Sequence, residues 1–208
     1  VTAYLPIQKG EVTLTHTGHR DRTLSAAPLQ PVLNTVGDWS YENGMSLNAS
    51  KTKSMNISIC LNISSTEPLT INNTEIEEVS EFKLLGVTVD RHLSFAAHVE
   101  NVFQKSRSKL HALLVLKRHG VSTEGLIRFY QANIRSGITY AAPAWFSFLT
   151  DYSRKSIESI QRQCLRVIFP DLSYEERLSK AAMTPICDYL DTMCSSFVLN
   201  VATSETHR

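Results

Sequence analysis

Apolar and polar positions follow two different periods along this chain, and each period predicts a different kind of element. A helix is predicted from Ala27, because Leu29, Val32, Leu33, Val36 and Trp39 recur at helical spacing and form one apolar stripe. Asn43 and Gly44 follow it and supply the left-handed backbone conformation with which helices often end. From Ser54 to Leu61 apolar and polar residues alternate, and this period of two predicts a half-buried strand.

Two further segments have the composition of strands. Leu69 to Ile76 predicts a tight hairpin, because Asn72 and Asn73 can adopt positive φ at its turn. Phe82 to Val89 is rich in Leu and Val and predicts another strand, in which Gly86 marks a bulge or a close approach by a second backbone.

After Asp90 the period becomes helical. Helices are expected from a cap at Ser94 to Gly120, from Thr123 to about Gly137, from Ser153 to Pro170, from a capping box at Ser173 and Glu176, and from Ile186 to Val201. Residues 1–24 show no sustained period, and we expect loose structure there. The order of elements predicts an α+β fold, with short antiparallel strands followed by an all-helical region.

Composition places the chain among ordinary globular proteins. Of its 208 residues 42% are hydrophobic and 20% are charged, which argues against both wholesale disorder and a membrane class. No apolar run approaches the roughly 20 residues of a spanning helix, and the N-terminus lacks a signal-peptide pattern. The expected location is therefore cytoplasmic or nuclear, without membrane contact.

The cysteines and the glycosylation sequons bear on the expected cytoplasmic or nuclear location. The cysteines are Cys60, Cys164, Cys187 and Cys194, and the sequons begin at Asn48, Asn56, Asn62 and Asn72. No pair of cysteines forms a Cys-x-x-Cys metal knuckle, and we expect buried free thiols. The sequons leave a secreted glycoprotein as an alternative, although such matches arise easily in a segment rich in Asn, Ser and Thr.

Charge is segregated along the chain, although the formal net charge is only +1. Between Cys60 and Glu100 seven acids stand against two bases, whereas between Val102 and Arg166 eleven bases stand against three acids. A cationic excess on helices suits a phosphate-backbone binder, because each neutralised phosphate releases counterions. Solvated helix faces carry the same excess, so both interpretations stay open.

Several motifs follow one another in the order typical of one family. They are Leu-Asn-x-x-Lys-Thr at Leu47–Thr52, Phe-Lys-Leu-Leu-Gly-Val at Phe82–Val87, Asp-x-x-Leu-Ser-Phe at Asp90–Phe95, Tyr-x-x-Pro-x-Trp at Tyr140–Trp145, and Ser-Tyr-Glu-Glu at Ser173–Glu176. Over roughly residues 27–200 they resemble the C-terminal part of non-LTR (LINE-type) retrotransposon reverse transcriptases. The resemblance implies a poorly ordered, non-matching N-terminus over 1–26, a palm remnant with a primer-grip-like hairpin over 27–95, and a helical thumb and post-thumb region over 96–208.

The N-terminal stretch departs from the family's pattern. The family carries a turn with two adjacent aspartates that, with another aspartate upstream, bind two Mg²⁺ ions. No adjacent Asp pair occurs here, and Asp21 is the only aspartate before the first predicted helix. The resemblance therefore implies a fragment of an RNA-directed DNA polymerase that contacts RNA/DNA template-primer. Mg²⁺ would belong to the intact parent enzyme, and we expect neither a metal site nor polymerisation from this chain alone.

The resemblance also supplies candidate site residues. Lys51 is a possible remnant general acid for the pyrophosphate leaving group, or else a solvated lysine before a strand. The residues expected to contact nucleic acid are Lys83, Gly86, Lys105, Arg107, Lys109, Lys117 and Arg118. The alternative function is a noncatalytic helical interaction module, domesticated or inert.

Aromatic and histidine side chains carry weaker expectations. Tyr130, Tyr140 and Trp145 either stack on bases or pack helices together, and packing is the interpretation we favour. His98 and His111 have no second ligand at metal spacing, so we expect them on the surface or between helices.

Overall fold

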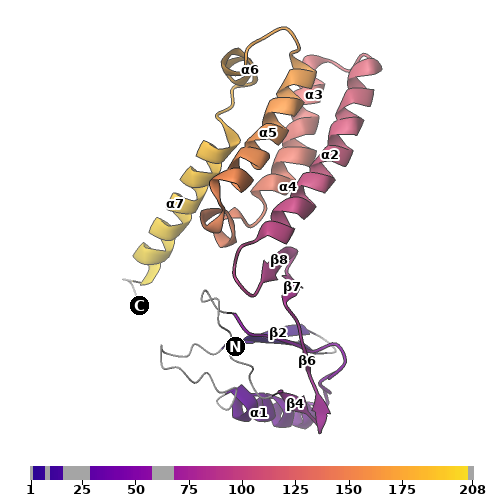
Figure 1. Ribbon diagram of the computed structural model, residues 1–208, viewed down its shortest axis with the longest axis vertical. Coiled ribbons are helices and arrows are strands. Elements are labelled where there is room, and N and C mark those ends of the chain that lie inside the picture. Colours follow the sequence, from indigo (N-terminus) through magenta and orange to yellow (C-terminus); the bar gives the residue numbers. More distant parts are fainter. Residues whose placement is uncertain (1, 8–9, 16–28, 58–67, 206–208) are drawn as a thin grey trace. The chain divides into compact units, whose positions relative to one another are not determined.

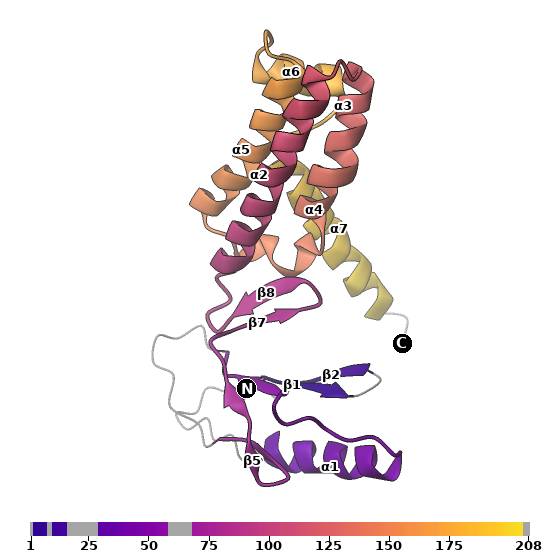
Figure 2. The ribbon, with the colours of Figure 1, turned by 90° about the vertical axis from the view of Figure 1, so that its right-hand side faces the viewer.

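The computed structural model describes residues 2–7, 10–15, 29–57 and 68–205, with the side chains of residues 2–15 left out. The chain divides into two units, Val1–Leu93 and Ser94–Arg208. Strands dominate the first and helices the second, as Figures 1 and 2 show. The predicted α+β class, with an all-helical C-terminal region, is confirmed.

Within its described residues, the first unit contains three small groups of strands and one helix. Its elements are β1 (Thr2–Ile7), β2 (Gly10–Thr15), α1 (Leu29–Glu42), β3 (Lys53–Met55), β4 (Thr70–Ile71), β5 (Thr74–Glu75), β6 (Glu77–Glu78), β7 (Glu81–Leu84) and β8 (Val87–Asp90). One sheet has the order β2-β1-β3-β6, in which only the β3–β6 pair is parallel. The pairs β4–β5 and β7–β8 are separate antiparallel hairpins.

The core of this unit lies between one face of α1 and the β4–β5 hairpin. Leu29 and Leu33 on α1 are buried against Leu69, Ile71 and Ile76 from the β4–β5 hairpin and its flanks. The helix, its end at a positive-φ Gly44 and the hairpin turn at Asn72 and Asn73 were all predicted correctly.

Three expectations in this unit were wrong in detail. Residues 1–24 were expected to be loose, but β1 and β2 pair as an antiparallel hairpin. The strand expected over Ser54–Leu61 ends at Met55, and residues 58–61 lie outside the described residues. The strand expected over Phe82–Val89 is two strands, because Leu85 and Gly86 both have positive φ and reverse the chain between β7 and β8.

Helices of the second unit lie side by side and share one core. They are α2 (Ala96–Arg118), α3 (Thr123–Phe129), the π-helix η1 (Tyr130–Arg135), α4 (Ser136–Thr139), the 3₁₀ turns η2 (Ala142–Ala144) and η3 (Phe146–Phe148), α5 (Asp151–Ile168), α6 (Tyr174–Ala181) and α7 (Ile186–Glu205). α2, α3 and α5 run alongside one another in both views (Figures 1 and 2). Among the described residues, no helix is both long enough and apolar enough to span a bilayer.

Helix ends in this unit follow local capping chemistry. Ser173 and Glu176 form the predicted capping box of α6, with each side chain bonded to the other residue's backbone N–H. Two predicted starts were displaced. Phe95, in a left-handed conformation, stands at the N-cap of α2 next to the expected Ser94, and Thr150 caps α5 three residues before Ser153.

Candidate nucleic-acid interface

The Leu-Asn-x-x-Lys-Thr element is a turn organised by Asn48. The Asn48 side-chain oxygen accepts bonds from the Ser50 hydroxyl at 2.7 Å and the Lys51 N–H at 3.1 Å. The Asn48 carbonyl accepts from the Thr52 hydroxyl at 2.8 Å, and Thr52 is fully buried. The turn leaves Lys51 exposed, so its side chain is available to solvent, and its assignment as a remnant general acid stays a prediction.

The β7–β8 hairpin presents the second predicted contact. Lys83 is exposed on β7, and Gly86 takes φ 89° at the turn, a conformation that side chains with a Cβ avoid. Leu85 beside it has φ 46° and is 74% exposed. A non-glycine residue held in the left-handed region without burial is uncommon and is a feature often found at functional sites.

The five cations predicted on α2 do not share one face of the helix. At about 100° per residue, Lys105 and Lys109 lie about 40° apart, and Arg107 and Arg118 lie about 20° apart. The two pairs point about 140–180° away from each other. A nucleic-acid backbone laid along α2 would therefore meet one pair and miss the other.

Two of these lysines bind the protein's own backbone. The ammonium of Lys109 donates to the carbonyl of Asn133 in the π-helix, and the ammonium of Lys117 donates to the carbonyl of Val167 near the end of α5. The Val167 carbonyl lies in the last turn of α5, where carbonyls lack intrahelical partners, so Lys117 supplies the missing donor there. Lys105, Arg107 and Arg118 are exposed, and the Arg107 guanidinium lies 5.8 Å from the Phe103 ring centre.

Helix packing accounts for most of the aromatic candidates. Tyr130 and Trp145 are fully buried, and the Trp145 ring nitrogen donates to the Tyr140 carbonyl at 3.0 Å. The His98 ring meets the Trp145 ring edge-on at 5.0 Å, and burial lowers the pKa of His98 with help from Lys105. His98 is thus an interhelix residue, as predicted, while His111 is exposed. Tyr140 keeps 55% of its surface exposed.

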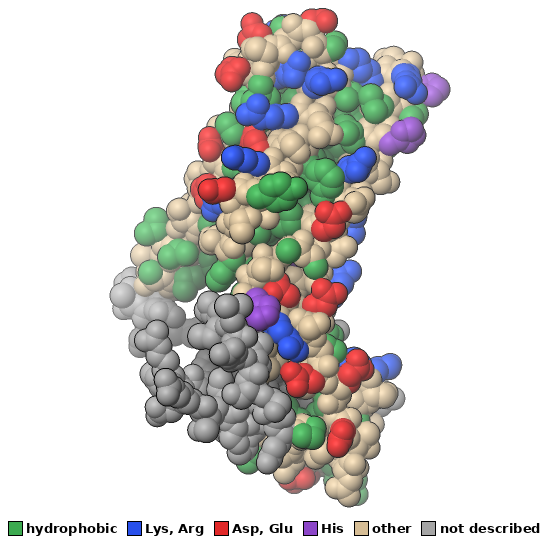
Figure 3. All heavy atoms as spheres, in the orientation of Figure 1, with side chains coloured by type: hydrophobic (Ala, Val, Ile, Leu, Met, Phe, Trp, Pro, Cys, Tyr) green, Lys and Arg blue, Asp and Glu red, His purple; other side chains and the backbone are tan. Residues whose placement is uncertain are grey.

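Sequence reasoning missed a cationic line on the outer face of α5. Lys155, Arg162 and Arg166 are exposed, and their spacing of seven and four residues keeps them within an arc of about 40°. That arc points away from the buried side of α5, which carries Ile157 and Cys164. Figure 3 shows Lys and Arg side chains along the course that α5 takes in Figure 1. The i, i+7, i+11 spacing was the signal in the sequence.

A buried polar network holds α5 against its neighbours. Gln161 is fully buried, accepts from the Tyr130 hydroxyl at 2.7 Å, and donates to the Thr184 carbonyl at 2.9 Å and to the Tyr174 hydroxyl at 3.2 Å. The Tyr174 hydroxyl also donates to Glu158. Burial raises the pKa of Tyr130 and of Tyr174, and for Tyr174 the bond to the Glu158 carboxylate adds to the effect. Both hydroxyls therefore remain neutral donors.

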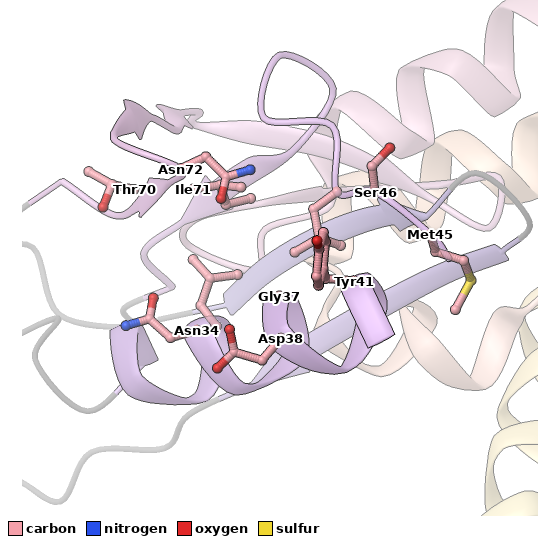
Figure 4. A pocket seen from close by; sticks show the side chains of 11 residues that line it. Asn34, Gly37, Asp38, Tyr41, Met45, Ser46, Thr70, Ile71 and Asn72 are labelled. Carbon is pink, nitrogen blue, oxygen red and sulfur yellow. The ribbon is translucent and has the colours of Figure 1, made fainter. Parts of the chain in front are cut away.

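Two hollows adjoin these elements. One of about 340 Å³ lies beside α5, and its lining is Asp151, Arg154, Lys155, Glu158, Arg162, Tyr174, Pro185, Cys187 and Asp188. The other, of about 450 Å³, lies between α1 and the β4–β5 turn (Figure 4). Asp38 is the single charged residue of its lining, so this second hollow does not suit a phosphate group.

Among the described residues, no three His, Cys, Asp or Glu side chains gather closely enough to hold a metal ion. The described residues therefore do not fit the two-Mg²⁺ centre that the resemblance implies for the parent enzyme.

Comparison with known proteins gives a consistent set of relatives. The chain is 26% identical to the RNA-directed DNA polymerase from mobile element jockey of Drosophila funebris over 148 residues, which is 67% of this chain and 15% of that protein. It is 25% identical to the probable RNA-directed DNA polymerase from transposon X-element of Drosophila melanogaster, over 69% of this chain and 16% of that protein. No family model and no solved structure matches.

The shared segment is short relative to these proteins. The jockey polymerase of Drosophila melanogaster is 25% identical over 67% of this chain, which again covers 15% of the relative. The chain thus spans about 15% of the length of the curated relatives it matches. Over this part of their length, the chain is similar to the RNA-directed DNA polymerases of the mobile elements jockey and X-element.

Proposed function

We propose that this chain is a part of a retrotransposon RNA-directed DNA polymerase that holds the template-primer by its phosphate backbone. The observation that carries the proposal is the outer face of α5, where Lys155, Arg162 and Arg166 are exposed in one line. Cations placed in this way position a nucleic acid without reading its sequence. Arg166 also lies in the last turn of α5, where the helix dipole favours a cation.

Within this proposal, polymerisation needs carboxylates from elsewhere in the protein. Mg²⁺, held by aspartates of the polymerase, would stabilise the charge that develops during phosphoryl transfer. The described residues of this chain supply no such cluster. The chain's own contribution is binding and positioning, in the cytoplasm or nucleus, and the 208-residue protein alone is expected not to incorporate nucleotides.

A noncatalytic interaction module is the second candidate. The C-terminal half of α7 is what favours it, because Phe197, Val198 and Leu199 are 52%, 64% and 65% exposed. Neighbouring apolar side chains of this size in solvent are a feature of protein-binding surfaces. The two functions are separable, because an apolar surface binds without a steep dependence on salt.

Fluorescence anisotropy with a labelled RNA/DNA hybrid tests the first candidate. Affinity should fall as salt rises, with a logarithmic slope of about 0.9 per neutralised phosphate. Lys155→Glu and Arg166→Glu should each weaken binding, whereas Lys180→Glu, at the exposed end of α6, should have a smaller effect. Lys109→Glu is unsuitable, because it would also break the bond to Asn133.

Two outcomes would overturn the proposal. One is an absence of hybrid binding at low salt by a chain whose helical circular dichroism is intact. The other is equal weakening by the α5 variants and by Lys180→Glu, which would indicate attraction by net charge alone.

A further inference from the structure

The outer face of α5 carries an exposed aromatic side chain as well as the three cations. Tyr152, one turn before Lys155, is 80% exposed. Viewed down the helix axis, Tyr152 lies within about 80° of each of the three cations. Ser159 also lies in the arc that these four residues span, and no acidic residue does. A tyrosine this exposed adds little to packing, because most of its apolar surface stays in water. Its ring is available to a ligand that approaches along α5.

The length of this face corresponds to a short nucleic-acid strand. From Tyr152 to Arg166 the helix rises about 21 Å, which is the length of about six stacked nucleotides of one strand. The Arg162 guanidinium lies 4.2 Å from the Tyr174 ring centre. That contact limits the side chain's freedom and reduces the entropy lost when it binds a phosphate.

The hollow of about 340 Å³ beside α5 adjoins the cationic line, since Lys155 and Arg162 belong to both. Its lining has three cations and three carboxylates, the latter being Asp151, Glu158 and Asp188. Glu158 is already bonded to the Tyr174 hydroxyl and to the Cys187 N–H. A balanced lining disfavours a phosphate group and suits an uncharged polar ring, such as an unpaired base.

We propose that the outer face of α5 and this hollow bind single-stranded nucleic acid. Lys155, Arg162 and Arg166 contact successive phosphates, an unpaired base stacks on Tyr152, and another enters the hollow. The inference rests on the proposed function and makes it more specific. A duplex can meet the three cations with its phosphates, but it cannot make the two base contacts, because its bases are stacked on each other and present no free face to a ring.

Anisotropy titrations of the 208-residue chain with three oligonucleotides test the inference. The probes are a labelled single-stranded RNA of about 12 nucleotides, the DNA of the same sequence, and the blunt RNA/DNA hybrid. Both single strands should bind more tightly than the hybrid at equal salt. Tyr152→Ala should weaken single-strand binding about 5- to 100-fold, with Tyr152→Phe near wild type, because stacking needs only the ring.

Charge variants test the phosphate contacts separately. Lys155→Gln and Arg166→Gln should each lower the salt slope for single strands by about 0.7. Lys180→Gln, on α6, is the matched control and should leave the slope unchanged. Circular dichroism of each variant establishes that the helices are retained.

Failure of this inference and failure of the proposed function are distinguishable. If the hybrid binds as tightly as the single strands and Tyr152→Ala changes neither, the single-strand site is overturned while backbone binding stands. If Tyr152→Ala weakens the hybrid and the single strands equally, the stacking contact is overturned. If no probe binds at low salt, both proposals fall.

Discussion

Replacing Gln161 by leucine removes the polar centre of the helical unit while keeping a side chain of similar size. Gln161 is fully buried and joins three partners on three different segments. Without it, the buried Tyr130 hydroxyl loses its acceptor and the Thr184 carbonyl loses a donor. The Tyr174 hydroxyl keeps its bond to Glu158.

The cost follows from these lost partners. A buried polar group left without a partner costs about 1–3 kcal/mol, and each other lost bond about 0.5–1.5 kcal/mol. Gln161→Leu should therefore lower the free energy of unfolding by about 2–6 kcal/mol. Tyr130→Phe should cost about 1–3 kcal/mol, because it leaves the Gln161 oxygen unpaired instead. The double variant should cost less than the sum by about 1–2 kcal/mol, since it removes donor and acceptor together.

Urea unfolding, followed by tryptophan emission, measures these differences. The two tryptophans are Trp39 in the first unit, which is half exposed, and Trp145 in the second, which is fully buried. In a Trp39→Phe background, Trp145 reports on the helical unit alone. The urea concentration at the midpoint of unfolding should fall, while the slope of the free energy of unfolding against urea concentration stays constant.

Additive losses of stability in the two single variants would refute a role for the Tyr130–Gln161 hydrogen bond. If the double variant loses the sum of the two single losses to within about 0.3 kcal/mol, the Tyr130–Gln161 bond is not the cause of either. A third variant, Ser159→Ala, changes a part-buried hydroxyl that is bonded locally to the Ser156 carbonyl. It should cost under about 1 kcal/mol and serves as a control for mutation within α5.

Two more predictions concern the buried thiol of Cys164 with the half-buried thiol of Cys187, and the β7–β8 turn. Burial raises the pKa of Cys164 and of Cys187 to about 12, so both should resist alkylation by iodoacetamide at pH 8 in the native protein and react once urea unfolds it. A raised native pKa stabilises the fold below the unfolded value near 9, so the free energy of unfolding should fall as pH rises from 9 toward 12. Cys164 would contribute up to about 1.4 kcal/mol per pH unit, and a flat profile would contradict this. Gly86→Ala should cost about 1 kcal/mol and speed hydrogen exchange of the β7–β8 amides, because φ is 89° there. Leu85→Asn should slow that exchange, and unchanged rates in both variants would show that the turn is not strained.

Local patterns determined the elements of this protein and its resemblance to one family. The capping box at Ser173, the turn at Asn72 and the long helices were readable because their hydrogen bonds close within a few residues. The ordered motifs were also readable, and the relatives that the chain matches are RNA-directed DNA polymerases of mobile elements, as the resemblance led us to expect. The role of Lys51 as a remnant general acid and the contacts of Lys83 and Gly86 with nucleic acid stay predictions.

Tertiary packing decided which cations face solvent. Lys109 and Lys117 bind carbonyls 24 and 50 residues away, and no local period encodes such pairs. The period of Ile157, Ile160 and Cys164 already places the cations of α5 on its outward side. The backbone partners of Lys109 and Lys117 on α2, in contrast, depend on which helices pack beside it. Periodicity determines what a helix buries, whereas the partners of long polar side chains depend on which helices lie beside it.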